Sequence, residues 1–123
     1  WMYHTGSDVL GVLLARAAGA SLPELLHDRV LGPLGMRDTG FHVPASSIHR
    51  LATLYRPGGE VSDEPATGAW SRPPEFPQGA GGLVSTVDDY LAFDEALRTG
   101  GLLPRAVVAE MTRDQLEPGQ GDG

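Results

Sequence analysis

Residues 1–19 read WMYHTGSDVLGVLLARAAG, a short aromatic and polar turn followed by a strongly apolar segment. The apolar side chains of this segment recur at helical spacing and form one stripe, made by Val9, Leu10, Leu13 and Ala17. Further apolar residues widen the stripe until the predicted helix is apolar on nearly every side. We therefore expect this helix to lie buried inside a larger structure, with the rest of the chain arranged around it.

The turn before this helix holds a candidate catalytic group, the phenol of Tyr3. Ser7 is the predicted N-cap of the helix, and Asp8 lies in its first turn, where a carboxylate complements the helix dipole. Tyr3 then falls just outside a rigid element, and rigid elements place catalytic groups more accurately than mobile loops do. A tyrosine beside a tryptophan is nevertheless a common packing residue, so position alone leaves both interpretations open.

Length and composition indicate one small globular domain with long connections. The chain has 123 residues, of which 41% are hydrophobic, together with 17 glycines and 10 prolines. It contains no run of eighteen apolar residues and no signal-peptide pattern, so no membrane-spanning segment is predicted. The first residue is Trp1 rather than Met, which suggests an excised piece or a processed chain.

Charge and residue usage exclude several kinds of chemistry. The net charge of −7 argues against nucleic-acid binding, which needs a basic surface. The absence of cysteine excludes disulfides and thiolate nucleophiles. All nine basic residues are arginine, so this chain alone supplies no P-loop lysine, no Schiff base and no lysine general base. We expect no cofactor.

Three further helices are predicted from capping signals. Ser21 and Glu24 form a capping box before an amphipathic helix that ends at the Pro/Gly turn of residues 32–36. A third helix begins at Ser85-Thr86 and ends before Gly100. Its expected inner face consists of Val87, Tyr90, Leu91 and Leu97. A fourth helix starts near Pro104.

Periodicity is weak in the middle of the chain, between residues 37 and 79. Residues 39–41 are expected to be extended, and residues 51–55 to form a short strand before a Pro-Gly-Gly turn. Residues 60–78 contain four prolines and are expected to be an irregular surface connection, since loops of this length are usually functional or mobile.

Local motifs other than the Tyr3 turn give weak signals. The four histidines, which are His4, His27, His42 and His49, include no pair at helical i, i+4 spacing, so surface or capping roles are favoured over a metal site. The glycine-rich loop of residues 79–82 precedes a helix and could cradle an anion, but this is a weak phosphate signal without a long preceding strand, and close backbone packing is favoured. No Gly-x-Ser-x-Gly elbow is present.

Three stretches together carry a family resemblance: residues 1–11 with Trp1-x-Tyr3-x-Thr5, residues 31–41 (LGPLGMRDTGF) and residues 79–90 (GAGGLVSTVDDY). In these stretches the chain resembles the serine β-lactamase-like proteins, a group that includes class C β-lactamases, family VIII esterases and D-alanyl-D-alanine carboxypeptidases. The resemblance runs to about Gln115, nearly the whole chain. It implies an α+β parent of β-lactamase/transpeptidase-like fold.

Within that parent, the resemblance places residues 1–116 in a partial domain, the helical region beside the active site, with residues 117–123 as a disordered tail. This chain is then mostly α-helical with long irregular connections. The activity implied is acyl transfer by a serine hydrolase on a small ester, peptide or amide, or β-lactam carbonyl. Tyr3 corresponds to the family's proton-relaying tyrosine and Thr5 to a substrate-contacting asparagine, while Gly81 and Gly82 line the substrate pocket.

The chain lacks two further motifs of the family, the nucleophilic Ser-x-x-Lys and the later Lys-Thr-Gly-like strand. A phenol acts as a base near neutral pH only where positive charge favours the phenolate, and the lysine that would supply this charge is absent. We therefore expect the parent to be an enzyme and this chain to be inactive alone. The apolar sides of the first and third helices need a cover, so an isolated chain is expected to self-associate.

Two other classes of function remain open. One is a non-catalytic helical binding module or pseudoenzyme scaffold, which a parent without Ser-x-x-Lys would indicate. The other is a metal hydrolase built on the histidines, which would show itself as a zinc-dependent rise in melting temperature. We expect no such rise.

Overall fold

The computed structural model describes residues 3–116; the expected tail of residues 117–123 lies outside this range. Helices are the dominant regular structure and long irregular segments connect them, as predicted. In chain order the elements are α1 (Thr5–Ala18), α2 (Leu22–Leu26), the π-helical turn η1 (His27–Leu31), the 3-10 helix η2 (Ala45–Arg50), β1 (Leu54–Tyr55), β2 (Val61–Asp63), the 3-10 helix η3 (Ala69–Ser71), α3 (Val87–Thr99) and α4 (Arg105–Thr112).

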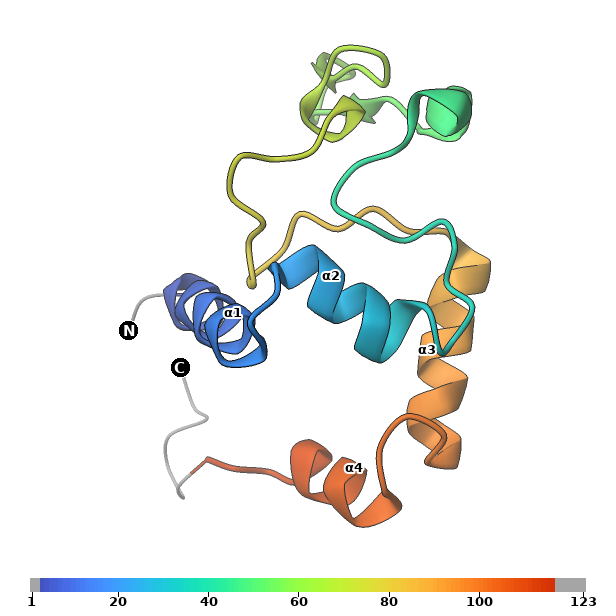
Figure 1. Ribbon diagram of the computed structural model, residues 1–123. Helices are drawn as coiled ribbons and strands as arrows, with labels where there is room; N and C mark the ends of the chain where they lie inside the picture. Colours follow the sequence, from blue (N-terminus) through green and yellow to red (C-terminus); the bar gives the residue numbers. More distant parts are fainter. Residues whose placement is uncertain (1–2, 117–123) are drawn as a thin grey trace.

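The helices form one group, and the middle of the chain stands apart from them. Figure 1 shows α2 between α1 and α3, with the segment from η2 to η3 projecting away from the helices. α1 packs against α2, and α3 packs against α4. The projecting segment contains the antiparallel pair of β1 and β2, in which Leu54 pairs with Asp63 and Tyr55 with Val61.

Local capping chemistry sets most of the helix ends where the sequence predicts them. The capping box is present: the Ser21 amide donates to Glu24 Oε2 at 2.9 Å, and the Glu24 amide donates to Ser21 Oγ at 3.4 Å. The hydrogen bonds that Glu24 Oε2 accepts from the Ser21 hydroxyl, at 2.6 Å, and from the Ser21 amide lower the pKa of the Glu24 carboxyl, since they favour its charged form. The Thr86 side chain caps α3, and Gly19 and Gly100 end α1 and α3 with left-handed φ values of 66° and 80°.

The start of α1 differs from the prediction. Ser7 is not the N-cap, because the helix begins two residues earlier, at Thr5, and His4 occupies the cap position without a side-chain hydrogen bond. The Ser7 and Asp8 amides both donate to the His4 carbonyl oxygen, at 2.9 and 3.2 Å, so Ser7 is already part of the first turn.

Two predicted apolar faces are exposed rather than buried. On α1 the stripe that includes Val9, which is 63% exposed, faces outward, and Gly11 is the buried residue of this helix. On α3 the predicted inner residues Val87, Tyr90 and Leu91 are exposed, and the buried residue is Ala96. Helical periodicity therefore identified apolar faces that stay largely exposed within residues 3–116.

The core is small. Its apolar members, each at most 8% exposed, are Leu22, Leu31, Met36, Phe41 and Ala96. The structure reduces the extended piece expected at residues 39–41 to an antiparallel bridge between Gly40 and Val84, and Phe41 follows in a bend. The predicted strand at residues 51–55 is shorter in the structure, and the 3-10 helix η2 was not predicted.

Within residues 3–116 no single helix is long and apolar enough to cross a membrane. α1 and residues 22–31 have the required length and composition only when taken together, and they meet at an angle of 80°.

Candidate active site

The predicted catalytic phenol lies at the start of α1 and is open to solvent. Tyr3 is 76% exposed, and its ring meets the imidazole of His4 edge to face, with 4.1 Å between the ring centroids and 65° between the planes. Thr5 is the first residue of α1 and is also exposed. Both predicted polar site residues of this turn are therefore accessible at one end of a 14-residue helix.

His4, between these two residues, has an unusual backbone conformation. Its φ of 73° and ψ of −45° lie in a γ-turn region that side-chain-bearing residues rarely adopt. Such conformations cost on the order of 1–3 kcal/mol and tend to occur at functional sites. This conformation stands between Tyr3 and the first residue of α1.

The glycine-rich loop docks on the same end of α1. The Ala80 amide donates to Asp8 Oδ1 at 3.1 Å. Next to this bond the two backbones touch: a Cβ on Gly79 would overlap the Ser7 carbonyl oxygen, and a Cβ on Gly11 would lie 3.1 Å from Gly79 Cα. The glycines of this contact are thus explained by close packing, as the sequence allowed.

The far end of the loop is held by a different part of the chain. Trp70 Nε1 donates to the carbonyl oxygen of Gly82 at 2.9 Å, and Gly82 has a φ of 86°, which favours glycine. Just beyond, the bridge of Gly40 and Val84 joins the loop to the extended piece before Phe41. Gly81 lies between the two anchored ends, is exposed, and would place a Cβ in open space.

A hollow of about 360 Å³ lies between the loop, α1 and α2. Its walls are mainly apolar, with Leu10, Leu14 and Leu22 on the helix side and Gly81 on the loop side. Of the four predicted site residues, only Gly81 lines it. A second hollow, of about 450 Å³, lies between α2 and residues 37–44 and contains none of the four.

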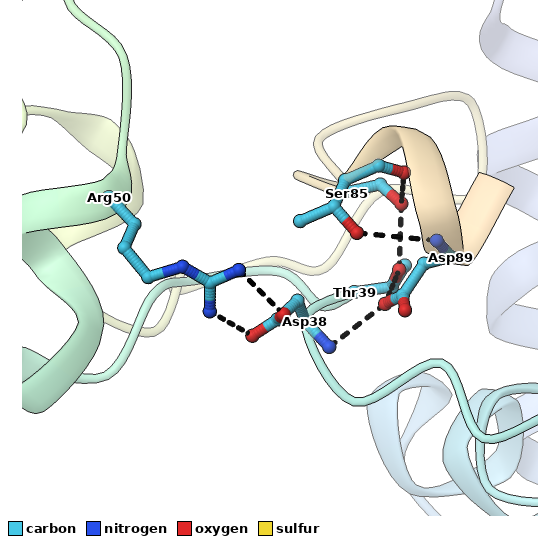
Figure 2. A network of polar contacts seen from close by, with 6 residues as sticks. Asp38, Thr39, Arg50, Ser85 and Asp89 are labelled. Atoms are coloured by element: carbon cyan, nitrogen blue, oxygen red, sulfur yellow. Dashed lines mark hydrogen bonds and ion pairs between the residues drawn. The ribbon is translucent and has the colours of Figure 1, made fainter.

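A polar network that sequence reasoning missed joins the segment after η1 to the start of α3 (Figure 2). Asp89 Oδ2 accepts hydrogen bonds from the Asp38 amide at 2.9 Å and from Thr39 Oγ1 at 2.8 Å. The Thr39 hydroxyl also lies 2.7 Å from Ser85 Oγ. Arg50 binds the Asp38 carboxylate with both terminal nitrogens, at 2.6 and 2.7 Å.

The network has an electrostatic consequence and a structural one. The hydrogen bonds from Arg50 hold the pKa of the Asp38 carboxyl below its ordinary value. The sequence indicated Asp89 only as a helix-start charge. In the structure it binds Asp38 and Thr39, which lie 51 and 50 positions earlier in the chain. The network thereby fixes the chain immediately after the glycine loop.

The histidines are dispersed. His27 contacts its neighbour Asp28, with 3.2 Å between Nδ1 and Oδ1. Among residues 3–116 no group of three histidine, aspartate or glutamate side chains is arranged to hold a metal ion.

Comparison with known proteins establishes the family. The profile of the Beta-lactamase family matches residues 1–123, so the chain belongs to this family and the resemblance seen in its motifs is confirmed. The fold is β-lactamase/transpeptidase-like. The chain is similar to Protein Rv1367c of Mycobacterium tuberculosis, with 42% identity over 101 residues, which are 80% of this chain and 25% of that protein.

Two further relatives carry names that state an activity. Esterase EstB of Burkholderia gladioli is 34% identical over 134 residues, covering 94% of this chain and 34% of that protein. The crystal structure of D-amino acid amidase from Ochrobactrum anthropi superposes with a TM-score of 0.70 at 31% identity, covering 89% of this chain and 31% of the amidase chain. At the family level the activity is therefore that of serine hydrolases, which work by acyl transfer. The chain spans about a quarter to a third of the length of these relatives.

Proposed function

We propose that this chain is a segment of a longer serine hydrolase, and that residues 1–116 form part of its catalytic domain. The substrate is a small ester, amide or β-lactam whose carbonyl acylates a serine contributed by the remainder of the protein. Family membership and the coverage of only a quarter to a third of the relatives support this proposal.

Tyr3 is the proposed proton relay. When the serine oxygen bonds to the substrate carbonyl carbon, its proton passes to the Tyr3 oxygen, and the same proton then passes to the leaving group as the old acyl bond breaks. The observation that carries this proposal is the exposed phenol at the strained start of α1, beside a docked glycine loop. The lysine that the resemblance implies beside the phenol must come from outside this chain, which has no lysine.

Thr5 and the glycine loop are the proposed substrate contacts. Thr5 offers a hydroxyl one turn from the loop anchor on α1. Gly81 keeps open the space above the loop, because any side chain there would project into it. Gly82 supports this geometry through its left-handed backbone and its carbonyl bond to Trp70.

Turnover by the longer protein tests this function. We expect it to hydrolyse p-nitrophenyl butyrate or a chromogenic cephalosporin, and we expect residues 1–123 alone to hydrolyse neither. Ester turnover by the isolated chain would refute its proposed inactivity. A longer protein that turns over neither substrate would favour a pseudoenzyme that keeps only the scaffold.

The accessible surface supports the view that the chain is incomplete as a folding unit. It measures 9396 Å², whereas a compact protein of 13.0 kDa exposes about 6,300 Å². Even at the full exposure of an unfolded chain, the nine undescribed residues account for only about 1,400 Å² of the difference. The remaining excess of accessible surface is comparable to the area that one partner buries in a large protein–protein interface.

The exposed apolar faces of α1 and α3 are the proposed sites of this missing cover. In the longer protein the rest of the domain covers them, and in the isolated chain a second copy does. Sedimentation of the isolated chain is expected to show concentration-dependent dimers or larger species. A strictly monomeric, folded chain would contradict this expectation.

A further inference from the structure

The contact between Asp8 and the glycine loop suggests a role beyond helix capping. Asp8 lies in the same helix turn that Tyr3 precedes, yet its carboxylate accepts a hydrogen bond from Ala80, 72 positions away in the sequence. We propose that Asp8 is a positioning residue, which holds the loop that carries Gly81 in a fixed place relative to the Tyr3 phenol. This proposal rests on the proposed function of Tyr3 as the proton relay.

Helix electrostatics alone do not require this geometry. A carboxylate in the first turn stabilises a helix through its charge, as the exposed Asp88 does at the start of α3. Asp8 instead directs Oδ1 at an amide of another segment, and both groups are partly buried. The bond joins the residue directly before Gly81 to the helix that begins just after Tyr3.

A steric contact and this hydrogen bond constrain the loop in different ways. The packing of Gly79 on Ser7 and Gly11 sets how closely the loop approaches α1, because the backbones meet without side chains between them. The bond from Ala80 to Asp8 sets the direction in which the loop leaves that contact. Together they determine where Gly81 stands above the hollow beside α1.

The expected effect is on catalysis as well as on substrate binding. A misplacement of about 1 Å by a residue remote from the chemistry can cost on the order of a hundredfold in rate. In the longer protein we therefore expect Asp8→Ala to lower kcat/KM by about 10- to 100-fold and to raise KM. Partial unfolding would lower the apparent kcat and leave KM unchanged, so the rise in KM identifies a displaced loop.

Two further variants separate positioning from charge. Asp8→Asn keeps an oxygen that accepts the Ala80 hydrogen bond but loses the charge, so we expect kcat/KM within about threefold of wild type if positioning is the role. Asp88→Ala removes a first-turn carboxylate of α3 that is remote from the loop, and no change in KM is expected. Equal losses in Asp8→Asn and Asp8→Ala would overturn the proposal.

Hydrogen exchange of the Ala80 amide gives a readout that needs no turnover. In the longer protein this amide is expected to exchange faster in Asp8→Ala and to stay protected in Asp8→Asn. Unchanged protection in Asp8→Ala would overturn the positioning role. Should Asp8→Ala fail to fold, Gly79→Ala displaces the same loop with Asp8 intact, and a KM equal to that of wild type would count against the proposal.

The proposed function and this inference fail differently. If Tyr3→Phe retains full turnover, the proton relay is wrong whatever Asp8 does. If Tyr3→Phe is inactive while Asp8→Ala keeps wild-type KM and amide protection, the relay stands and the positioning role of Asp8 is wrong.

Discussion

Removal of the Asp89 carboxylate is expected to detach the segment after η1 from α3. Asp89→Ala deletes the acceptor of two hydrogen bonds, from the Asp38 amide at 2.9 Å and from the Thr39 hydroxyl at 2.8 Å. Hydrogen bonds to a charged group contribute about 1.5–3 kcal/mol each. Because Asp89 is partly exposed, we take the lower end for each bond and expect a loss of about 3 kcal/mol in the free energy of unfolding.

Asp88→Ala is the matched control for this substitution. Asp88 lies in the same first turn and is exposed, so its loss removes only the interaction with the helix dipole, about 0.3–1 kcal/mol. Urea unfolding of the longer protein, followed by helical circular dichroism, gives the free energy of unfolding of both variants. Hydrogen exchange of the Asp38 amide reports whether its bond to Asp89 is lost. If the free energies of unfolding of Asp89→Ala and Asp88→Ala differ by less than about 0.5 kcal/mol, the two hydrogen bonds to Asp89 do not stabilise the fold as expected.

Two other predictions concern charge and backbone strain. The hydrogen bonds from Arg50 lower the folded-state pKa of Asp38 below the ordinary 3.8, so the pair's stabilisation is present above that pH and is lost as the pH falls through the lowered value. The urea midpoint of unfolding is therefore expected to fall as the pH is lowered, and to fall less in Arg50→Gln. An equal fall in Arg50→Gln would exclude the Arg50–Asp38 pair as the cause. His4→Gly should be about 1–2 kcal/mol more stable than His4→Ala, because both lose the ring and only glycine relieves the positive φ. Equal urea midpoints for these two variants would show that the His4 backbone is unstrained.

Features set by neighbours in sequence were predictable. The capping box of Ser21 and Glu24, the glycine ends of α1 and α3, and the Thr86 cap each depend on residues within one helical turn of one another. The start of α1 was the exception. A serine before an apolar run normally predicts an N-cap, but the strained backbone of His4, which has no local sequence signal, starts the helix earlier.

Contacts between distant segments could not be predicted. Nothing in the local sequence indicates that Asp8 meets Ala80 or that Asp89 meets Thr39, since each pair lies fifty or more positions apart and depends on the tertiary arrangement. Helical periodicity correctly identified apolar faces on α1 and α3 but does not state what covers them. Family resemblance supplied the fold and suggested the proposed roles of Tyr3 and the glycine loop, which composition and spacing alone left open.

The proposed function rests on the catalytic role of the Tyr3 phenol. The most direct test compares kcat/KM of the longer protein with that of Tyr3→Phe on whichever of p-nitrophenyl butyrate and the chromogenic cephalosporin it hydrolyses. Tyr55→Phe is the control, since Tyr55 is similarly exposed but lies in β1 of the projecting segment.

General acid–base groups contribute about 10²- to 10⁴-fold. We therefore predict a loss of about a hundredfold or more for Tyr3→Phe and no loss for Tyr55→Phe. Full turnover by Tyr3→Phe would contradict the proposed proton relay and leave Tyr3 as a packing residue at the start of α1.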